Sequence, residues 1–233
     1  MKRIFFSFLL LGAAFIVKAQ TADEIIAKHV EAIGGADAWR KVQSTKYEGN
    51  VKVQGADVSV TLTTLNGKGS RQDISLMGMN GFRIVTPAAG WNYMPFQGQT
   101  EVDPMTAEDL KEAQDDMDPQ GKLVDYKEKG TTVELFGKDD VDGTECYKIV
   151  ATTKSGVKET FFIDPKTSFV IKSIAVLKAN GQEVEQASMY SNYTKLPEGI
   201  VVAMSIMLPF GEMNITKVEV NPVVDEGIFK PAK

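Results

Sequence analysis

Cysteine and histidine are almost absent from this chain of 233 residues, which holds one of each. Cys146 and His29 together supply two of the roughly four ligands that a structural zinc site needs. No disulfide can form within one copy, because Cys146 has no partner. His29 lies inside a predicted helix, where a single histidine is most often a packing residue rather than a catalyst. We therefore expect no metal, no cofactor and no enzymatic activity.

Long apolar runs are absent beyond the first residues. Residues 1–19 combine a basic start, an apolar run from Ile4 to Val17 and a small-residue cleavage site ending at Ala19. This pattern predicts a secretory signal peptide, cut after Ala19. A retained membrane anchor would need about 20 apolar residues, which this run does not reach. We expect a mature protein of residues 20–233 that is soluble outside the cytoplasm and has no integral membrane segment.

Basic residues are fewer than acidic ones. The whole chain has 26 basic against 31 acidic residues, a formal net charge of −5, and cleavage after Ala19 would remove three of the basic ones. Nucleic acids and anionic bilayer surfaces both reward basic patches. The composition therefore argues against a nucleic-acid partner.

The mature chain opens with a helical pattern. Thr21 and Glu24 form the two ends of a capping box. The apolar residues Ile26, Val30 and Ile33 follow at helical spacing, and glycines at 34–35 predict the helix end. Residues 36–42 favour a second, short helical turn.

From Thr45 the apolar period changes from 3.6 to 2, which is typical of an antiparallel sheet with one wet face. Three Asn-Gly pairs predict hairpin turns, because both residues tolerate positive φ. These pairs are Asn66-Gly67, Asn80-Gly81 and Asn180-Gly181. The pattern predicts an α+β fold of about eleven strands, in which a curved antiparallel sheet curls around helices on one side, and residues 20–233 form a single domain.

One helix is expected to interrupt the strands at residues 106–118. Thr106 provides the N-cap, with Asp109 three residues on, and Pro119 ends the helix. Its apolar stripe is thin and consists of Leu110, Ala113 and Met117. Such a helix can cover the mouth of a cavity but cannot anchor a core.

The segment from Val201 to Phe210 is apolar on both sides of a strand pattern. A strand of this kind must be covered on both faces, by protein or by ligand. Its even positions include Met204, Ile206, Leu208 and Phe210. Together with an excess of flexible methionines, this segment predicts an apolar cavity on the concave side of the sheet, suited to an acyl chain.

Three further motifs carry a family resemblance. Residues 90–96 (GWNYMPF), 162–167 (FIDPKT) and 221–231 (NPVVDEGIFKP) resemble, in this order, motifs of the LolA/LolB-like periplasmic lipoprotein carriers. The resemblance implies an unclosed β-barrel whose apolar cavity is covered by helices. It also implies a periplasmic location and a role in outer-membrane lipoprotein sorting.

The resemblance places an aromatic strand at the cavity. Combined with the apolar strand and the thin helix, it gives ten candidate ligand-binding residues: Trp91, Tyr93, Met94, Phe96, Leu110, Met117, Met204, Ile206, Leu208 and Phe210. The carriers' lid-latching arginine has its nearest counterpart in Arg71, at a different spacing and without the proline that follows it in the family.

Two functions from different classes remain open. The first is a periplasmic carrier that binds lipoprotein acyl chains or another lipid. The alternative is a non-catalytic envelope interaction module of the same fold, whose cavity is filled by its own side chains and which docks an envelope protein. An enzyme acting on envelope lipids or glycans has the least support.

Overall fold

Thirteen strands form one antiparallel sheet in the computed structural model, which describes residues 20–179 and 182–231. The strands are β1 (Ser44–Val53), β2 (Ala56–Leu65), β3 (Gly69–Leu76), β4 (Met79–Val85), β5 (Gly90–Tyr93), β6 (Asp103–Pro104), β7 (Thr132–Val141), β8 (Thr144–Thr152), β9 (Lys158–Ile163), β10 (Val170–Ala179), β11 (Gln182–Lys195), β12 (Val201–Leu208) and β13 (Gly211–Val220). The helices are α1 (Ala22–Ala32), α2 (Ala36–Arg40) and α3 (Ala107–Ala113), with 3₁₀ turns η1 (Pro95–Gln97), η2 (Gln114–Met117) and η3 (Glu226–Phe229). The predicted signal peptide at residues 1–19 lies outside the described residues.

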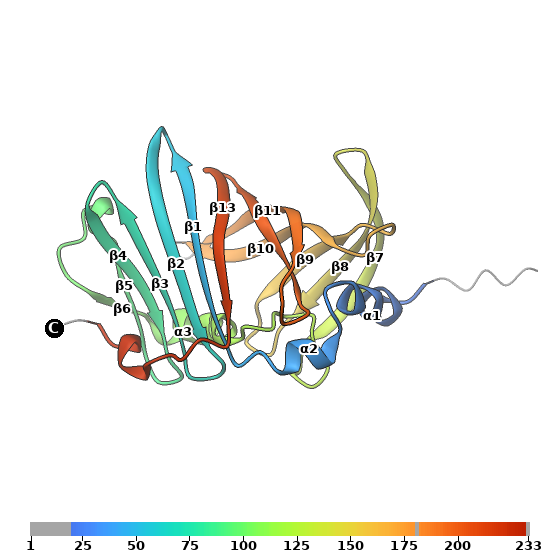
Figure 1. Ribbon diagram of the computed structural model, residues 1–233, viewed down its shortest axis with the longest axis horizontal. Helices are drawn as coiled ribbons and strands as arrows, with labels where there is room; N and C mark the ends of the chain where they lie inside the picture. Colours follow the sequence, from blue (N-terminus) through green and yellow to red (C-terminus); the bar gives the residue numbers. More distant parts are fainter. Residues whose placement is uncertain (1–19, 180–181, 232–233) are drawn as a thin grey trace, which may run out of the picture.

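The strand order is β6-β5-β4-β3-β2-β1-β13-β12-β11-β10-β9-β8-β7. Strands β1 to β6 form what we call the first wing, and strands β7 to β13 form the second wing. Pairing of β1 with β13 joins the two wings. The end strands β6 and β7 do not pair with each other, so the sheet stays open, and Figure 1 shows it curling into an unclosed barrel. This confirms the predicted fold class, with thirteen strands in place of about eleven.

Both N-terminal helices match their sequence signals. The Thr21 hydroxyl accepts a hydrogen bond from the Glu24 N–H, and the Glu24 carboxylate accepts one from the Thr21 N–H, so the capping box is present. Gly34 and Gly35, at φ of 113° and 84°, follow the end of α1. In the described part of the chain, no helix is long and apolar enough to cross a membrane.

The third helix begins where the sequence predicts. The Thr106 hydroxyl caps α3 by accepting from the Asp109 N–H, and the last turn tightens into η2 before Pro119. Side chains of this helix pack on Val85 of β4 in a small cluster. The helix therefore covers one patch of the first wing, as its thin apolar stripe suggests.

One hairpin prediction is wrong. The turn between β3 and β4 is made by Met77 and Gly78, at φ of 52° and 81°, while Asn80 and Gly81 lie within β4. Gly81 serves close packing instead of a turn, because a Cβ there would lie 2.7 Å from the Tyr93 carbonyl oxygen. The Asn66-Gly67 turn is confirmed, with Leu65 pairing with Gly69 across it. Residues 180–181 lie outside the described residues.

The main core lies between α1 and the second wing. Ile25 and Ile26 of α1 pack with Ile149 and Ile163 of the sheet. A second cluster surrounds Trp39 of α2 and continues toward the start of β12. These clusters fix α1 against β8 and β9 and α2 near the start of β12, and Figure 1 shows α1 at the β7–β8 end of the second wing.

Candidate ligand-binding cavity

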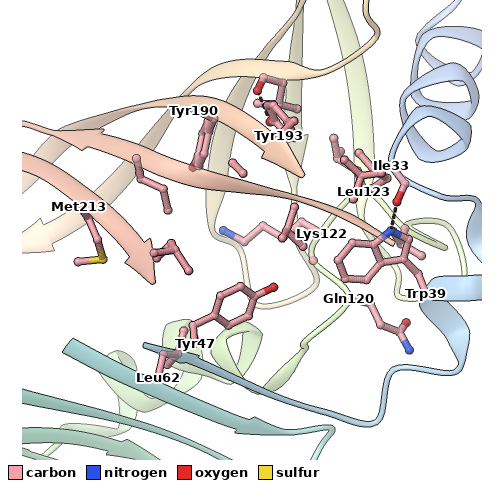
Figure 2. Close-up of a pocket in the computed structure, with 18 of the residues that line it drawn as sticks. Ile33, Trp39, Tyr47, Leu62, Gln120, Lys122, Leu123, Tyr190, Tyr193 and Met213 are labelled. Atoms are coloured by element: carbon pink, nitrogen blue, oxygen red, sulfur yellow. Dashed lines mark hydrogen bonds between the residues drawn. The ribbon is translucent and has the colours of Figure 1, made fainter. Parts of the chain in front are cut away.

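A cavity of about 410 Å³ opens on the concave side of the sheet, beside the joint between the wings. Its wall comes from both wings, from α1 and α2, and from the segment 120–124, as Figure 2 shows. The lining residues are His29, Ile33, Trp39, Tyr47, Gly49, Val60, Leu62, Gln72, Gln120, Gly121, Lys122, Leu123, Val124, Phe161, Val170, Tyr190, Tyr193, Val201, Val202, Ala203, Ile206, Met213 and Ile215. Most of these side chains are aliphatic or aromatic, the surface expected for an apolar ligand.

Strand alternation explains the lining at the joint. Tyr47 and Gly49 are two residues apart on β1 and therefore share a face, opposite the wet face that carries Asn50. Gly49 sits at a β-bulge, where a Cβ would lie 2.9 Å from the Asn214 carbonyl oxygen. The glycine thus permits close pairing with β13 and places no side chain in the hollow.

Strand β12 contributes its first three residues, Val201 to Ala203, and Ile206 farther along. Val202 is buried against the Trp39 cluster, and Ile206 pairs with Tyr190 and Met213 on the neighbouring strands. The side chains of Ile206, Tyr190 and Met213 all line the cavity. On the other face, Met207 is 46% exposed. In the second half of β12, Ile206 therefore faces the cavity and Met207 faces away from it.

A segment without regular structure, residues 120–124, closes one side of the cavity. Leu123 and Val124 are buried beside α1 and α2. Trp39 is oriented by a hydrogen bond from its Nε1 to the Ile33 carbonyl oxygen, 2.9 Å long, which Figure 2 draws. Its indole ring therefore stays against the cavity and not in solvent.

His29 belongs to the cavity wall. Its Nδ1 lies 2.9 Å from the Ser168 carbonyl oxygen, and the side chain is buried. Burial lowers the pKa of His29 below its ordinary value, because the imidazolium would lose its hydration. The ring is thus neutral at neutral pH, and Nδ1 donates its proton to the carbonyl.

Three tyrosines bring hydroxyl groups to the cavity. Tyr190 Oη lies 3.0 Å from Ser173 Oγ, and Tyr193 Oη donates to the Val170 carbonyl oxygen. Burial raises the pKa of all three phenols, that of Tyr47 to about 12. All three are therefore uncharged hydrogen-bonding groups at neutral pH.

Lys122 is the charged residue of the lining. Its Nζ lies 2.7 Å from a Glu159 carboxylate oxygen. Both side chains are mostly buried, at 24% and 13% exposed. The Glu159 carboxylate balances the charge of the Lys122 ammonium, so the pair adds no net charge to the cavity wall.

Of the ten residues predicted from sequence, Ile206 lines this cavity and the other nine do not. Met204 packs at the edge of the Trp39 cluster, Leu208 ends β12, and Phe210 is half exposed in the turn that follows. Leu110 and Met117 pack with Val85 under α3. The part of these nine residues in ligand binding stays a prediction.

The aromatic strand lies away from the cavity. The Tyr93 ring packs at 5.7 Å from the Phe82 ring, and Trp91 pairs with Ile84 on β4. Met94 and Phe96 approach Gly81. Since Phe82 and Ile84 alternate with Arg83 and Val85, Trp91 and Tyr93 share the face opposite to the Val85 patch.

Arg71 makes a different contact from the one the resemblance implies. Its guanidinium pairs with Asp73 and donates to the Ile228 carbonyl oxygen at 2.8 Å. It also lies over the Phe82 ring, 5.3 Å from the centroid. Arg71 therefore holds the C-terminal turn η3 against β3, and not a helix over the cavity.

Sequence reasoning missed most of the lining. The period-two pattern of residues 45–54 does mark Tyr47 and Gly49 as one face of β1, and this signal could have found them. Leu123 and Val124 follow no periodic pattern, so their place in the wall depends on tertiary packing alone.

Comparison with known proteins gives matches in structure only. No protein-family model matches the chain, and no curated protein sequence matches it. A LolA superfamily protein from Nitrosomonas europaea is similar over 91% of this chain and 99% of its own, with a TM-score of 0.56 and 13% identity.

Two other solved structures are similar at the same 13% identity. A DUF1329 family protein from Desulfovibrio piger covers 91% of this chain and 98% of its own at a TM-score of 0.55. A putative outer membrane lipoprotein-sorting protein domain from Vibrio parahaemolyticus covers 88% and 94% at 0.52. The unclosed sheet, its helices and these likenesses together establish that the chain has a LolA-like fold.

Proposed function

We propose that this protein is a non-catalytic carrier that holds an acyl chain of a lipoprotein or of another lipid in the concave cavity. The observation that carries the proposal is the apolar hollow of about 410 Å³, which the protein's own side chains leave open. The LolA-like fold supports the same reading, since one solved structure with this fold is described as a lipoprotein-sorting domain.

The energetics favour an acyl chain. Burying one methylene group is worth about 0.8 kcal/mol, so a chain of about twelve contributes on the order of 10 kcal/mol. This is comparable with the roughly 4–15 kcal/mol that association costs in lost freedom. A single chain can therefore be held reversibly, as a carrier requires.

The periplasm is the compartment we propose, because residues 1–19 have the pattern of a secretory signal peptide. Mass spectrometry of the protein from a periplasmic extract tests this part. The expected mature chain begins at Gln20, and recovery of the uncut chain from the cytoplasm would contradict it.

Neighbouring residues on β12 provide a matched test of binding. Ile206→Glu places a carboxylate in the cavity, whereas Met207→Glu places one on the opposite, exposed face. We expect the first variant to bind the apolar dye N-phenyl-1-naphthylamine at least tenfold more weakly and the second to bind it unchanged. Equal binding by both variants would show that the dye does not enter this cavity.

The alternative is an envelope interaction module with a filled cavity, and native mass spectrometry separates the two. A carrier purified from cells without detergent should retain a fraction with bound lipid mass. Absence of lipid, together with no dye binding, would exclude the carrier and leave the interaction module.

A further inference from the structure

The cavity wall has no net charge. Its titratable side chains come from α1, β1, β11 and the segment 120–124: His29, Tyr47, Tyr190, Tyr193 and Lys122. The histidine and the tyrosines are neutral at neutral pH, for the reasons given above. The Lys122 ammonium is neutralised by Glu159 of β9 at 2.7 Å.

Two polar side chains in the described part of the wall make no hydrogen bond at all. Among the described residues, the side chains of Tyr47 and Gln72 form no hydrogen bond with the protein, whereas the Tyr190 and Tyr193 hydroxyls each have a partner. Tyr47 pairs with Leu62, and Leu62 pairs with Gln72, so the three side chains stand in one row across β1, β2 and β3. Figure 2 shows the Tyr47 hydroxyl pointing across the pocket toward the side where Trp39 and Lys122 lie.

Neither group is sealed from solvent, because no side-chain nitrogen or oxygen among the described residues is both buried and unpartnered. A ligand that fills the cavity and displaces water from these two groups must bond to them in its place, because a polar group left unpaired against an apolar ligand is costly. The phenol O–H and the amide N–H groups are donors, and the amide oxygen is an acceptor. A ligand with an uncharged carbonyl would accept from these donors. An ionised group would lie beside them without a free counter-charge, so its burial there would be unfavourable.

We infer that the ligand is an uncharged acyl derivative, an ester or an amide, whose carbonyl lies beside Tyr47 and Gln72, and not a free fatty acid. The volume of about 410 Å³ is near the lower end of the roughly 300–1,000 Å³ usual for ligand pockets, which favours one chain. This inference rests on the proposed function and names the chemistry of the ligand at the same cavity.

The first test compares ligands of equal chain length at pH 8 by displacement of N-phenyl-1-naphthylamine. Methyl myristate should bind at least about tenfold more tightly than myristate, because the carboxylate is ionised at this pH. Equal or tighter binding of myristate would overturn the inference while leaving the carrier proposal intact. Dye binding that neither compound displaces would instead overturn the carrier proposal.

Two larger probes distinguish the sources of such a group. Monomyristoylglycerol is an ester of glycerol, and N-myristoylglycinamide stands for an acylated peptide. Tighter binding of either one than of myristate supports the inference, and the tighter of the two identifies the source. Binding of both more weakly than myristate would overturn it.

Removal of the Glu159 carboxylate from the Lys122–Glu159 pair should shift the ligand preference from the ester toward the carboxylate. Glu159→Gln leaves the Lys122 ammonium without its partner in the wall, so myristate should gain at least about fivefold relative to methyl myristate. Glu145→Gln is the control, because it breaks the exposed Lys138–Glu145 pair, which does not line the cavity. An unchanged preference in the Glu159 variant would show that the acyl head group does not reach this wall.

Removal of the donor itself completes the test. Tyr47→Phe keeps the ring and removes the hydroxyl, so methyl myristate should bind about three- to tenfold more weakly while binding of the dye is unchanged. Gln72→Leu tests the second donor in the same way. Full ester affinity in both variants would overturn the placement of the carbonyl.

Discussion

The two wings of the sheet cover their concave faces by different means. In the second wing, α1 packs Ile25 and Ile26 into a cluster of eight buried side chains. In the first wing, α3 and η2 contribute to a cluster with three buried side chains, Val85, Ala113 and Met117. The second wing is therefore a packed helix-on-sheet layer, whereas the first is a sheet with a light cover.

This difference explains where the cavity lies. It opens beside the β1–β13 joint, where the packing of α1 and α2 ends and before the cover of α3 begins. The first wing adds a wall of strands, with Val60 and Leu62 of β2, that no helix fills. A hollow of this kind needs one rigid side to hold its shape and one open side to admit a ligand.

The largest expected effect is the loss of stability when a core side chain is shortened in the second wing, compared with the same change in the first wing. Ile25→Ala removes a side chain that is 2% exposed in the α1 cluster. We expect a loss of about 2–5 kcal/mol in the free energy of unfolding, from lost transfer energy and the cavity left behind. Urea titration followed by circular dichroism measures it.

Leu110→Ala is the counterpart in the first wing, since Leu110 is only partly buried at the edge of the α3 cluster. Its cost should stay below about 1.5 kcal/mol, because less apolar surface is lost. Equal losses in the two variants would show that the wings are equally well packed.

A smaller effect is the pH dependence of stability that His29 of α1 gives to the second wing. The pKa of His29 lies below its ordinary value of 6.5 in the folded protein, so the unfolded chain binds more protons as the pH falls through that value. The contribution of neutral His29 is thus complete above pH 6.5 and is lost progressively below it. We expect the free energy of unfolding to drop by about 1 kcal/mol from pH 7 to pH 5.5.

His29→Gln removes the titrating ring and should remove this slope. Carboxylates with lowered pKa, such as those of Asp23 and Asp125, lose their contributions only at more acidic pH. Urea titrations of both proteins at pH 7 and pH 5.5 provide the check. A slope that persists in the variant would assign the pH dependence to other groups.

The smallest effect compares the two helix caps. Thr21→Ala removes the capping box of α1, and Thr106→Ala removes the hydroxyl cap of α3. The first should lower the free energy of global unfolding by about 1 kcal/mol, because α1 belongs to the main core. The second should speed amide exchange in α3 with little effect on global unfolding. Loss of global stability in both would mean that α3 is part of the core.

Much of the fold was predictable from sequence because its signals are local. The capping residues Thr21 and Thr106 and the alternation of residues 45–54 act within one turn or one strand. The Asn80-Gly81 prediction failed because Gly81 is required by contact with Tyr93, a residue on another strand. A glycine does not reveal from sequence whether it serves a turn or a close approach.

The sequence predicted the type of site, an apolar cavity, but not most of the residues that line it. An apolar concave cavity followed from the two-sided strand at 201–210, yet nine of the ten residues chosen for it lie elsewhere. The curvature of the sheet and the path of residues 120–124 decide which inward side chains meet, and neither is encoded in a local pattern. Tyr190 and Leu123 reach the same hollow from distant parts of the chain for that reason.

The pairing of β1 with β13 has a consequence for how the protein is made. Every other strand pair connects neighbours in the chain and can form as a local hairpin or meander, with little loop-closure entropy to overcome. The joint between the wings instead brings together residues from opposite ends of the described chain, which makes it a slow, late event. A chain in which β1 and β13 have not yet paired holds two separate meanders, and the cavity, which takes its lining from both wings, is assembled only when they join.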